Sequence, residues 1–349
     1  MKKIIHTSSY LFDFRKDIEI FGMFGPGNLG DEAMLVAAYK TLHWRRVVPC
    51  LSTPNRPWLD MLLKRRRRHH LIVAGGTLIH GGQTQWLDHV ESRANKGLSV
   101  RFFGTGIAFS EDQIANRSMS FSRWSKILRN SAEVYLRGQD SVDIYKKMGV
   151  KADVFGDFAF LLHDPEIPLS DFNKRVDTIG VNVGLCLDDQ EGFEKSFITI
   201  VKYLSERYRL VFHVVRDCNK EVTLRVIQAA NIESITKVEY HYYDPYAFMH
   251  SIRHYSGFIG LKLHAAGLAM VAGVPTVMVA YMPKARDFMT PLGGGEGILL
   301  NLPLDPDVAL KNLDLQMSLN DLSKLPVAKI VNIAEQQRRI MKRAFEVEF

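Results

Sequence analysis

Short apolar segments alternate with helix-like segments through the first half of the chain. The apolar runs are "IEIFGMFG" (18–25), "LIVAGGTLI" (71–79), "SVRFFGTGIA" (99–108) and "EVYLRG" (133–138). Helical patterns follow at 31–42 and in "DSVDIYKKMG". Continuous apolar strands that alternate with helices are typical of a parallel sheet covered on both faces. The first half therefore predicts an α/β domain.

The same alternation restarts after a polar, proline-bearing segment at 163–177, which reads as a linker. Strands are predicted at 178–185, 208–216, 256–261 and 276–281, and helices at 191–206 and 219–230. The tail from residue 327 has apolar positions at helical spacing and predicts a packed helix. We therefore expect two Rossmann-like α/β domains, 1–165 and 175–349, that face a cleft.

Composition indicates a soluble globular protein with an anionic partner. The 349 residues are 46% hydrophobic and 24% charged, enough for two domains of ordinary size. The net charge of +7 points to a phosphorylated metabolite, a membrane surface or nucleic acid. Basic residues interleaved with aromatics, or a known nucleic-acid module, are not found, so nucleic acid is not expected.

Cysteine usage and hydropathy favour the cytoplasm. The three cysteines, Cys50, Cys186 and Cys218, have no CxxC spacing, which favours a reducing compartment. The start lacks the apolar segment of a secretory signal. The longest uncharged run, 265–283, is interrupted by "AGVP" and ends in β-forming residues. It predicts a buried helix, a turn and a buried strand rather than a transmembrane segment.

The glycine-rich stretch "GPGNLGDE" formally matches the GxGxxG fingerprint of dinucleotide-binding folds. Such folds need an acidic residue near the end of the next strand, but "RRVVPCLSTPN" has none. Asp31 and Glu32 also stand where a pyrophosphate would bind, and would repel it. Asp31 is better suited to bind or activate sugar hydroxyls, or simply to cap the helix.

A second glycine pair, Gly75 and Gly76, follows the apolar run at 71–74, and "GG" recurs at 81–82. Glycines at a strand's carboxyl end let a ligand approach backbone N–H groups, although a tight turn also explains them.

The basic run "KRRRRHH" at 64–70 allows two interpretations. It could form a solvated helix end. It could also contact anionic lipid headgroups, at about 1 kcal/mol per cation, and so place the protein at the inner face of the membrane.

Two histidines at helical spacing, His250 and His254, raise the possibility of a metal site. The sequence between them, "HSIRH", lacks the glutamate of the zincin motif. We interpret them as helix-surface residues and expect no metal.

The strongest functional signal interrupts the apolar segment "GFIGLKLHAAGLAMVAGVPTVMVAY" at Lys262 and His264. Both follow a predicted strand and open a predicted helix, whose N-terminus adds donors for an anion. Lys284 and Arg137 occupy corresponding positions after other strands. Each could be a capping or snorkelling residue. Together, from both halves, they predict an anion site in the cleft.

At these residues the chain resembles the polysaccharide pyruvyl transferase family. The ordered matches lie at 27–32 (GNLGDE), Gly75–Gly76, Arg137 with Ser141, Asp157, Asp244–Pro245, Leu263–His264, and Tyr281 with Lys284. Two positions depart from the family pattern. Lys262 stands where an RLH motif has arginine, and Gly138 where an RDxxS motif has aspartate. Lysine keeps the charge but not the bidentate fork of arginine.

The resemblance implies a GT-B-like fold and a ketal-pyruvyltransferase. Such an enzyme transfers pyruvate from phosphoenolpyruvate, its donor substrate, to a sugar of a cell-surface polysaccharide or its lipid-linked precursor, and needs no cofactor. The first domain would then be the acceptor side and the second the donor side.

In this interpretation His264 is the general acid and Asp31 orients or deprotonates the acceptor. Arg137 and Lys262 hold the donor, with Lys284 at the departing phosphate and Gly75–Gly76 nearby. Two alternatives remain open: a GT-B glycosyltransferase that uses a nucleotide sugar, and a non-catalytic, membrane-associated assembly protein.

Overall fold

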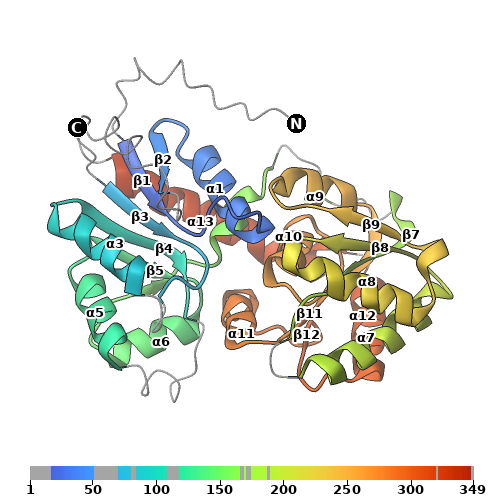
Figure 1. Cartoon of the computed structure of the whole chain (residues 1–349). Coiled ribbons are helices and arrows are strands. Elements are labelled where there is room, and N and C mark those ends of the chain that lie inside the picture. The colour runs from blue at the N-terminus through green and yellow to red at the C-terminus, as the bar shows by residue number, and fades with distance from the viewer. Residues whose placement is uncertain are drawn as a thin grey trace.

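Two parallel β-sheets, one in each half of the chain, organise the protein (Figure 1). The computed structural model describes residues 17–50, 70–79, 84–107, 118–165, 169, 174–186, 189–319 and 321–346. Within these residues each sheet has six strands, and every neighbouring pair is parallel. Helices cover both faces of the sheets. The predicted α/β class with two Rossmann-like units is confirmed.

The first sheet has the order β2-β1-β3-β4-β5-β6. Its strands are β1 (Asp17–Phe21), β2 (Arg46–Cys50), β3 (His70–Ala74), β4 (Ser99–Thr105), β5 (Glu133–Leu136) and β6 (Asp153–Val154). Its helices are α1 (Leu29–Thr41), α3 (Thr84–Asn95), α5 (Ser118–Arg129) and α6 (Gln139–Lys147), followed by the 3-10 helix η2 (Phe158–Leu162). The strand order reverses between β1 and β3, and such switch points are where ligands bind in doubly wound folds.

The second sheet has the order β12-β11-β10-β7-β8-β9 and switches between β7 and β10. Its strands are β7 (Val176–Asn182), β8 (Arg209–Val214), β9 (Lys237–Tyr240), β10 (Tyr255–Gly260), β11 (Thr276–Val279) and β12 (Leu299–Leu300). The helices are α7 (Gln190–Ser205), α8 (Lys220–Ala230), α9 (Pro245–Ile252), α10 (Leu263–Val271), α11 (Pro283–Met289) and α12 (Pro306–Ser318). Short 3-10 helices are η4 (Asp217–Asn219), η5 (Glu233–Ile235), η6 (Thr290–Leu292) and η7 (Leu322–Lys324).

The strands that the sequence did not predict, β2, β6, β9 and β12, all lie at sheet edges. Each has two to five residues. An edge strand is covered less completely than a central one, so it need not be a continuous apolar run. In β9, "KVEY", both terminal residues are exposed and the two between are half-buried. The central strands β3 and β10 are buried almost throughout, which is why their apolar runs are conspicuous.

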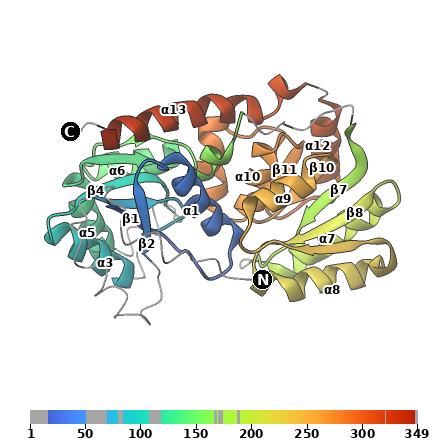
Figure 2. The same ribbon diagram turned by 90° about the horizontal axis from the view of Figure 1, so that it is seen from above.

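The last helix, α13 (Val327–Glu346), follows the second sheet in sequence but extends over the first half of the molecule (Figure 2). Gln337 Nε2 donates hydrogen bonds of 2.9 Å to the backbone oxygens of Phe155 and Asp157. Near the helix end, the Phe345 ring packs against Phe103 of β4, with centroids 6.2 Å apart. The tail therefore ties the two halves together. The linker predicted at 163–177 falls partly outside the described residues.

The apolar segment 265–283 forms most of α10, a turn and β11, as the sequence predicts. No helix in the described part of the chain is long and apolar enough to cross a bilayer.

Candidate functional site

The carboxyl ends of the two sheets meet at their switch points. The loop after β1 touches the loop after β8: Leu29 N donates a 3.0 Å hydrogen bond to Val215 O. Asn28 and Arg216 form an isolated antiparallel bridge beside it. Because ligands of doubly wound folds bind outside the carboxyl ends of the strands, this junction is the expected place for a site.

A cavity of about 200 Å³ lies at this junction. Seven residues were given a catalytic or donor-binding role in the sequence analysis, and six of them line this cavity: Asp31, Gly76, Arg137, Lys262, His264 and Lys284. Residues far apart in the chain, from both halves, therefore surround one small volume. The seventh, Gly75, is not among the lining residues.

His264, in the first turn of α10, contacts the first half of the molecule. Its Nε2 lies 3.5 Å from Oδ2 of Asp157, a fully buried carboxylate. Burial alone would raise the pKa of Asp157, but the interactions with His264 and Arg137 outweigh it and lower that pKa. On its other side the ring packs against Gly30, where a Cβ atom would lie 2.0 Å from His264 Nδ1. Only glycine at position 30 leaves room for the imidazole.

Asp31, in the first turn of α1, is partly buried beside His264. Burial raises the pKa of its carboxyl group, while His264, the Asn28 amide and Arg216 oppose that shift. The Asn28 side-chain amide donates a hydrogen bond to the Asp31 carboxylate. Asp31 is thus held among polar and cationic groups at the cavity wall. This position suits a group that accepts or orients a hydroxyl proton.

The glycine loop before α1 is held by hydrogen bonds to a carboxylate of α1 itself. Gly25 N donates a 2.7 Å hydrogen bond to Glu32 Oε1, and the Gly27 amide also bonds the Glu32 carboxylate. Gly27 has φ of 76°, and a Cβ atom there would meet the Tyr243 hydroxyl at 2.8 Å. Because an internal carboxylate engages these N–H groups, they are not presented to a phosphate. This geometry supports the interpretation that the loop is not a dinucleotide fingerprint.

The two glycines after β3 have different surroundings. Both have positive φ, 58° at Gly75 and 62° at Gly76. A Cβ atom on Gly75 would lie 1.6 Å from the Met34 sulfur, so close packing against α1 accounts for this glycine. At Gly76 the nearest atom to such a Cβ is Asp31 Oδ1, at 3.8 Å. Gly76 therefore belongs to the cavity wall, while Gly81–Gly82 lie outside the described residues.

Two lysines from the second half of the chain flank the ring of Tyr281 at the cavity. Lys262 Nζ lies 5.1 Å and Lys284 Nζ 5.0 Å from the centre of the ring. The backbone N of Lys262 donates to Asn182 Oδ1 at 2.9 Å, which fixes the start of α10. Burial lowers the pKa of Lys262. Burial, together with nearby Arg137, lowers the pKa of Lys284 to about 8. A bound anion would relieve this positive charge.

Arg137 is buried at the end of β5 and pairs with a carboxylate of the other half. Its Nε and Nη2 lie 3.2 Å and 3.1 Å from Oδ2 of Asp287, in α11. Both side chains are almost fully buried. The guanidinium lines the cavity, but Asp287 holds it in place.

The same carboxylate explains the glycine at position 138. Gly138 is the N-cap residue of α6, where an aspartate would normally accept a hydrogen bond from the third helical residue. Here Asp287 Oδ1 accepts that bond from Ser141 N at 3.0 Å, and Thr290 Oγ1 accepts one from Gln139 N at 2.8 Å. A Cβ atom on Gly138 would lie 1.9 Å from the Asp287 backbone oxygen. Helix α6 is therefore capped from the other half of the molecule.

Arg216 is a cavity residue that the sequence analysis missed. It lies two residues after the end of β8, just as Lys262 lies two residues after the end of β10. The search for charged residues at the carboxyl end of each predicted strand, applied to "YRLVFHVVR", would have found it. Asp157 was noticed only as part of the resemblance, and its contact with His264 depends on the packing of the two halves.

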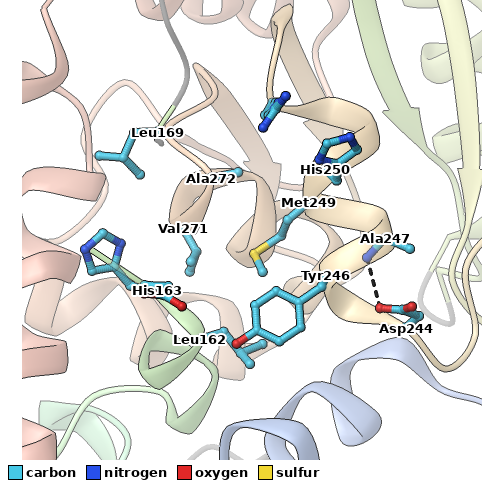
Figure 3. A pocket seen from close by; sticks show the side chains of 12 residues that line it. Leu162, His163, Leu169, Asp244, Tyr246, Ala247, Met249, His250, Val271 and Ala272 are labelled. Carbon is cyan, nitrogen blue, oxygen red and sulfur yellow. Dashed lines mark hydrogen bonds between the residues drawn. The ribbon is translucent and has the colours of Figure 1, made fainter. Parts of the chain in front are cut away.

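Several other residues from the sequence analysis lie away from this cavity. Asp244 caps α9: its Oδ1 accepts a hydrogen bond from Ala247 N at 2.9 Å (Figure 3). His250, exposed on the same helix, lines a separate cavity of about 700 Å³ that holds none of the predicted site residues. In the basic run, residues 64–69 lie outside the described part of the chain. His70 is not part of a solvated face, because it begins β3 and is buried.

Comparison with known protein families identifies the family of this chain. The family model for polysaccharide pyruvyl transferase matches residues 28–282, a range that contains every residue of the cavity described above except Met23 and Lys284. The chain belongs to the polysaccharide pyruvyl transferase family. This membership confirms the resemblance drawn from the sequence motifs. No curated protein matches the sequence.

Solved structures similar to this family member share its two-domain GT-B-like fold, which the sequence predicted. UDP-N-acetylglucosamine 2-epimerase from Rickettsia bellii has a TM-score of 0.62 at 9% identity, over 94% of this chain and 95% of that one. Methanocaldococcus jannaschii UDP-GlcNAc 2-epimerase, in complex with UDP-GlcNAc and UDP, scores 0.58 at 12% identity, over 94% and 99%. Anabaena Alr3699/HepE, in complex with UDP and glucose, scores 0.58 at 13% identity, over 94% and 100%. At these identities the likeness concerns the fold.

Proposed function

We propose that this protein transfers pyruvate from phosphoenolpyruvate to two hydroxyl groups of a saccharide and so forms a pyruvate ketal. The observation that carries the proposal is the charge pattern of the junction cavity. Arg137, Arg216, Lys262 and Lys284 line it together with a histidine that contacts a buried carboxylate. Phosphoenolpyruvate carries a phosphate and a carboxylate, and cationic donors bind such groups through charge-assisted hydrogen bonds.

The reaction needs one proton delivered to carbon and the protons of two hydroxyl groups removed. His264 donates a proton to the methylene carbon of the donor, while Asp157 behind it stabilises the imidazolium form. The first saccharide hydroxyl attacks the neighbouring carbon, assisted by Asp31. The second hydroxyl displaces phosphate, whose departure Lys284 and Arg216 assist by charge. One of the two hydroxyl protons restores the proton that His264 gave to the new methyl group. The other leaves with the phosphate.

The size of the cavity favours this donor over a nucleotide sugar. At about 200 Å³ it is smaller than the roughly 300–1,000 Å³ typical of pockets for drug-sized ligands. In the glycine loop, the Glu32 carboxylate also occupies the Gly25 and Gly27 amides, which are therefore not available to a diphosphate. The nucleotide-sugar glycosyltransferase remains the second candidate, because similar structures were solved with UDP or UDP-GlcNAc bound.

The substitution at Lys262 does not argue for a non-catalytic protein. Its ammonium group lies at the cavity, and a Cβ atom on Gly184 would approach the Lys262 Cε to 2.5 Å. The lysine stem is therefore closely packed against the turn after β7, where the larger guanidinium fork of arginine has little room.

The acceptor is a saccharide of a cell-surface polysaccharide, free or lipid-linked, and the reaction takes place in the cytoplasm. Contact of the remaining basic residues, 64–69, with the inner membrane face stays a prediction. The test is incubation with phosphoenolpyruvate and a panel of glycans, followed by mass spectrometry. We expect a product whose mass exceeds that of the acceptor glycan by the mass of pyruvic acid minus the mass of water. One phosphate should be released for each product formed. Transfer of a hexose from UDP-glucose or UDP-GlcNAc instead would replace this proposal with the glycosyltransferase.

A further inference from the structure

A cluster of two histidines and a glutamate lies at the outer edge of the second sheet. His213 is in β8, Glu239 is in β9, and His241 directly follows β9. In the parallel register His213 is paired with Glu239. His241 N donates to Val214 O at 2.9 Å and so continues the ladder. Because side chains two residues apart emerge on one face of a strand, pairing brings all three together.

One carboxylate oxygen faces both imidazoles. Glu239 Oε2 lies 3.2 Å from His241 Nε2 and 3.8 Å from His213 Nδ1. One donor atom from each of the three residues can be chosen so that all lie within 4.8 Å of one another. The other carboxylate oxygen, Oε1, accepts a 2.6 Å hydrogen bond from Lys237 Nζ. Lys237 thus orients the carboxylate and leaves Oε2 to the two rings.

His213 needs a partner that the surrounding residues do not supply. Its side chain is fully buried, and neither ring nitrogen has a hydrogen-bond partner among the described residues. The ring is surrounded by aromatic side chains, with Phe248 edge-on at 5.3 Å and Phe258 at 6.0 Å between centroids. Buried polar groups without a partner are rare in proteins and call for an explanation.

We propose that His213, Glu239 and His241 bind one divalent transition-metal ion, of which Zn²⁺ is the best fit. Two imidazole nitrogens and a carboxylate oxygen are a donor set suited to such ions, whereas Mg²⁺ and Ca²⁺ prefer oxygen ligands alone. At metal–ligand distances near 2.1 Å, tetrahedral coordination separates ligand atoms by about 3.4 Å. The separations of 3.2 Å and 3.8 Å between these atoms are close to this value.

The ion would join the edge strand β9 to β8. Glu239 and His241 are partly exposed, at 18% and 13% of their side chains, so solvent can supply the remaining ligand. The backbone oxygen of His213 accepts a 2.8 Å hydrogen bond from Asn182 Nδ2, and Asn182 Oδ1 accepts one from Lys262 N. The site therefore supports the strand end that carries Arg216, while remaining separate from the cavity residues.

A second cluster, Glu19, Cys50 and His89, also brings potential ligands together. There the Arg93 guanidinium lies 2.9 Å from Glu19 Oε1, so a cation already pairs with the carboxylate. This cluster must still be distinguished from the proposed site in any binding experiment.

The test uses the full chain, freed of metal with a chelator and then titrated with Zn²⁺ by calorimetry and with Co²⁺ by visible absorption. We expect one ion per chain and d–d bands of nitrogen- and oxygen-ligated Co²⁺. Glu239→Gln and His241→Ala, at partly exposed positions, should each weaken binding about tenfold or more. His250→Ala, which removes an exposed histidine of α9, and Lys237→Met, which removes only the charge partner, should still bind the ion.

Three results would overturn the proposal. The first is that the unaltered protein binds no stoichiometric ion. The second is that Glu239→Gln and His241→Ala both bind the ion as tightly as the unaltered protein. The third is a thiolate-to-Co²⁺ charge-transfer band, which would place the ion at Cys50. None of these readouts depends on pyruvyl transfer, so the site and the proposed function fail or succeed separately.

Discussion

His264 and Asp157 meet across the boundary between the two halves of the protein, with Nε2 of the imidazole 3.5 Å from Oδ2 of the carboxylate. Asp157 is fixed on its own side, because Oδ1 accepts a 2.9 Å hydrogen bond from Ala159 N at the start of η2. The proposed acid comes from one sheet and its negative partner from the other. The proposed catalytic pair therefore exists only when the two halves are packed together.

Replacing the histidine tests its role as the acid. His264→Gln keeps a polar side chain of similar length but cannot deliver a proton, so turnover should fall by roughly 10²–10⁴-fold. Binding of phosphoenolpyruvate should persist, because the cationic groups are untouched. Steady-state ketal formation and donor-induced stabilisation are measured side by side. Turnover at the unaltered rate would remove His264 from the mechanism.

Asp157→Asn tests the partner of the acid. The asparagine oxygen can still accept from Ala159 N, but the negative charge behind His264 is lost. We expect lower turnover with little change in donor affinity. Asp153→Asn, at an exposed position in β6, is the matched control and should behave as the unaltered protein. Equal activity of both variants would show that the carboxylate only caps η2.

Lys284, which we propose assists the departing phosphate, predicts that donor binding depends on pH. The pKa of Lys284 is lowered to about 8 by burial and by Arg137. Below pH 8 its side chain is cationic in the free protein, and above pH 8 it becomes neutral. Because a bound anion favours the cation, the dissociation constant for phosphoenolpyruvate should rise as pH increases through 8, by up to about tenfold per pH unit. In Lys284→Arg, which stays charged, this rise should be absent, and parallel profiles would exclude Lys284 from donor binding.

The buried pair between Arg137 and Asp287 predicts a large effect on stability. Asp287→Ala leaves the guanidinium buried without its charge partner and removes the cap on Ser141 N. Breaking such a pair typically costs about 3–5 kcal/mol, so the free energy of unfolding should fall by this amount. The neighbouring exposed Arg286→Ala should cost much less. Urea unfolding measures both, and a loss under about 1 kcal/mol in Asp287→Ala would contradict this account of the interface.

Position 138 provides a steric test. A Cβ atom there would lie 1.9 Å from the backbone oxygen of Asp287, so Gly138→Ala should destabilise the protein by about 1–3 kcal/mol. Because the clash is with backbone, the additional change Asp287→Ala should not restore stability. Unfolding of the single and double variants separates these effects. A single variant as stable as the unaltered protein would mean that the two halves are less closely packed at α6.

The sequence is most informative where local pattern determines structure. Continuous apolar runs predicted β3 and β10, because these strands are buried on both faces. Charged residues just after predicted strands indicated three of the four cationic side chains of the cavity, those of Arg137, Lys262 and Lys284, because parallel strands bring their carboxyl ends to one edge. Edge strands such as β9 carry polar residues and gave no comparable signal.

Contacts between distant segments were beyond sequence reasoning. Nothing in the neighbourhood of Gly138 indicates that Asp287 would cap α6. Likewise, His213 and His241 become neighbours only through the pairing of β8 with β9, whereas the more obvious spacing of His250 and His254 drew attention to a helix surface. These relationships depend on tertiary packing, which no local periodicity encodes.

The most direct test of the account is the thermal stability of the purified protein with phosphoenolpyruvate, inorganic phosphate and UDP-GlcNAc in separate samples. A ligand at 100 times its dissociation constant should stabilise the folded state by about 2.7 kcal/mol, and no acceptor is required. We predict stabilisation by phosphoenolpyruvate that exceeds that by phosphate and is lost in Lys284→Met. Stabilisation by UDP-GlcNAc alone would contradict the account and identify a nucleotide-sugar enzyme.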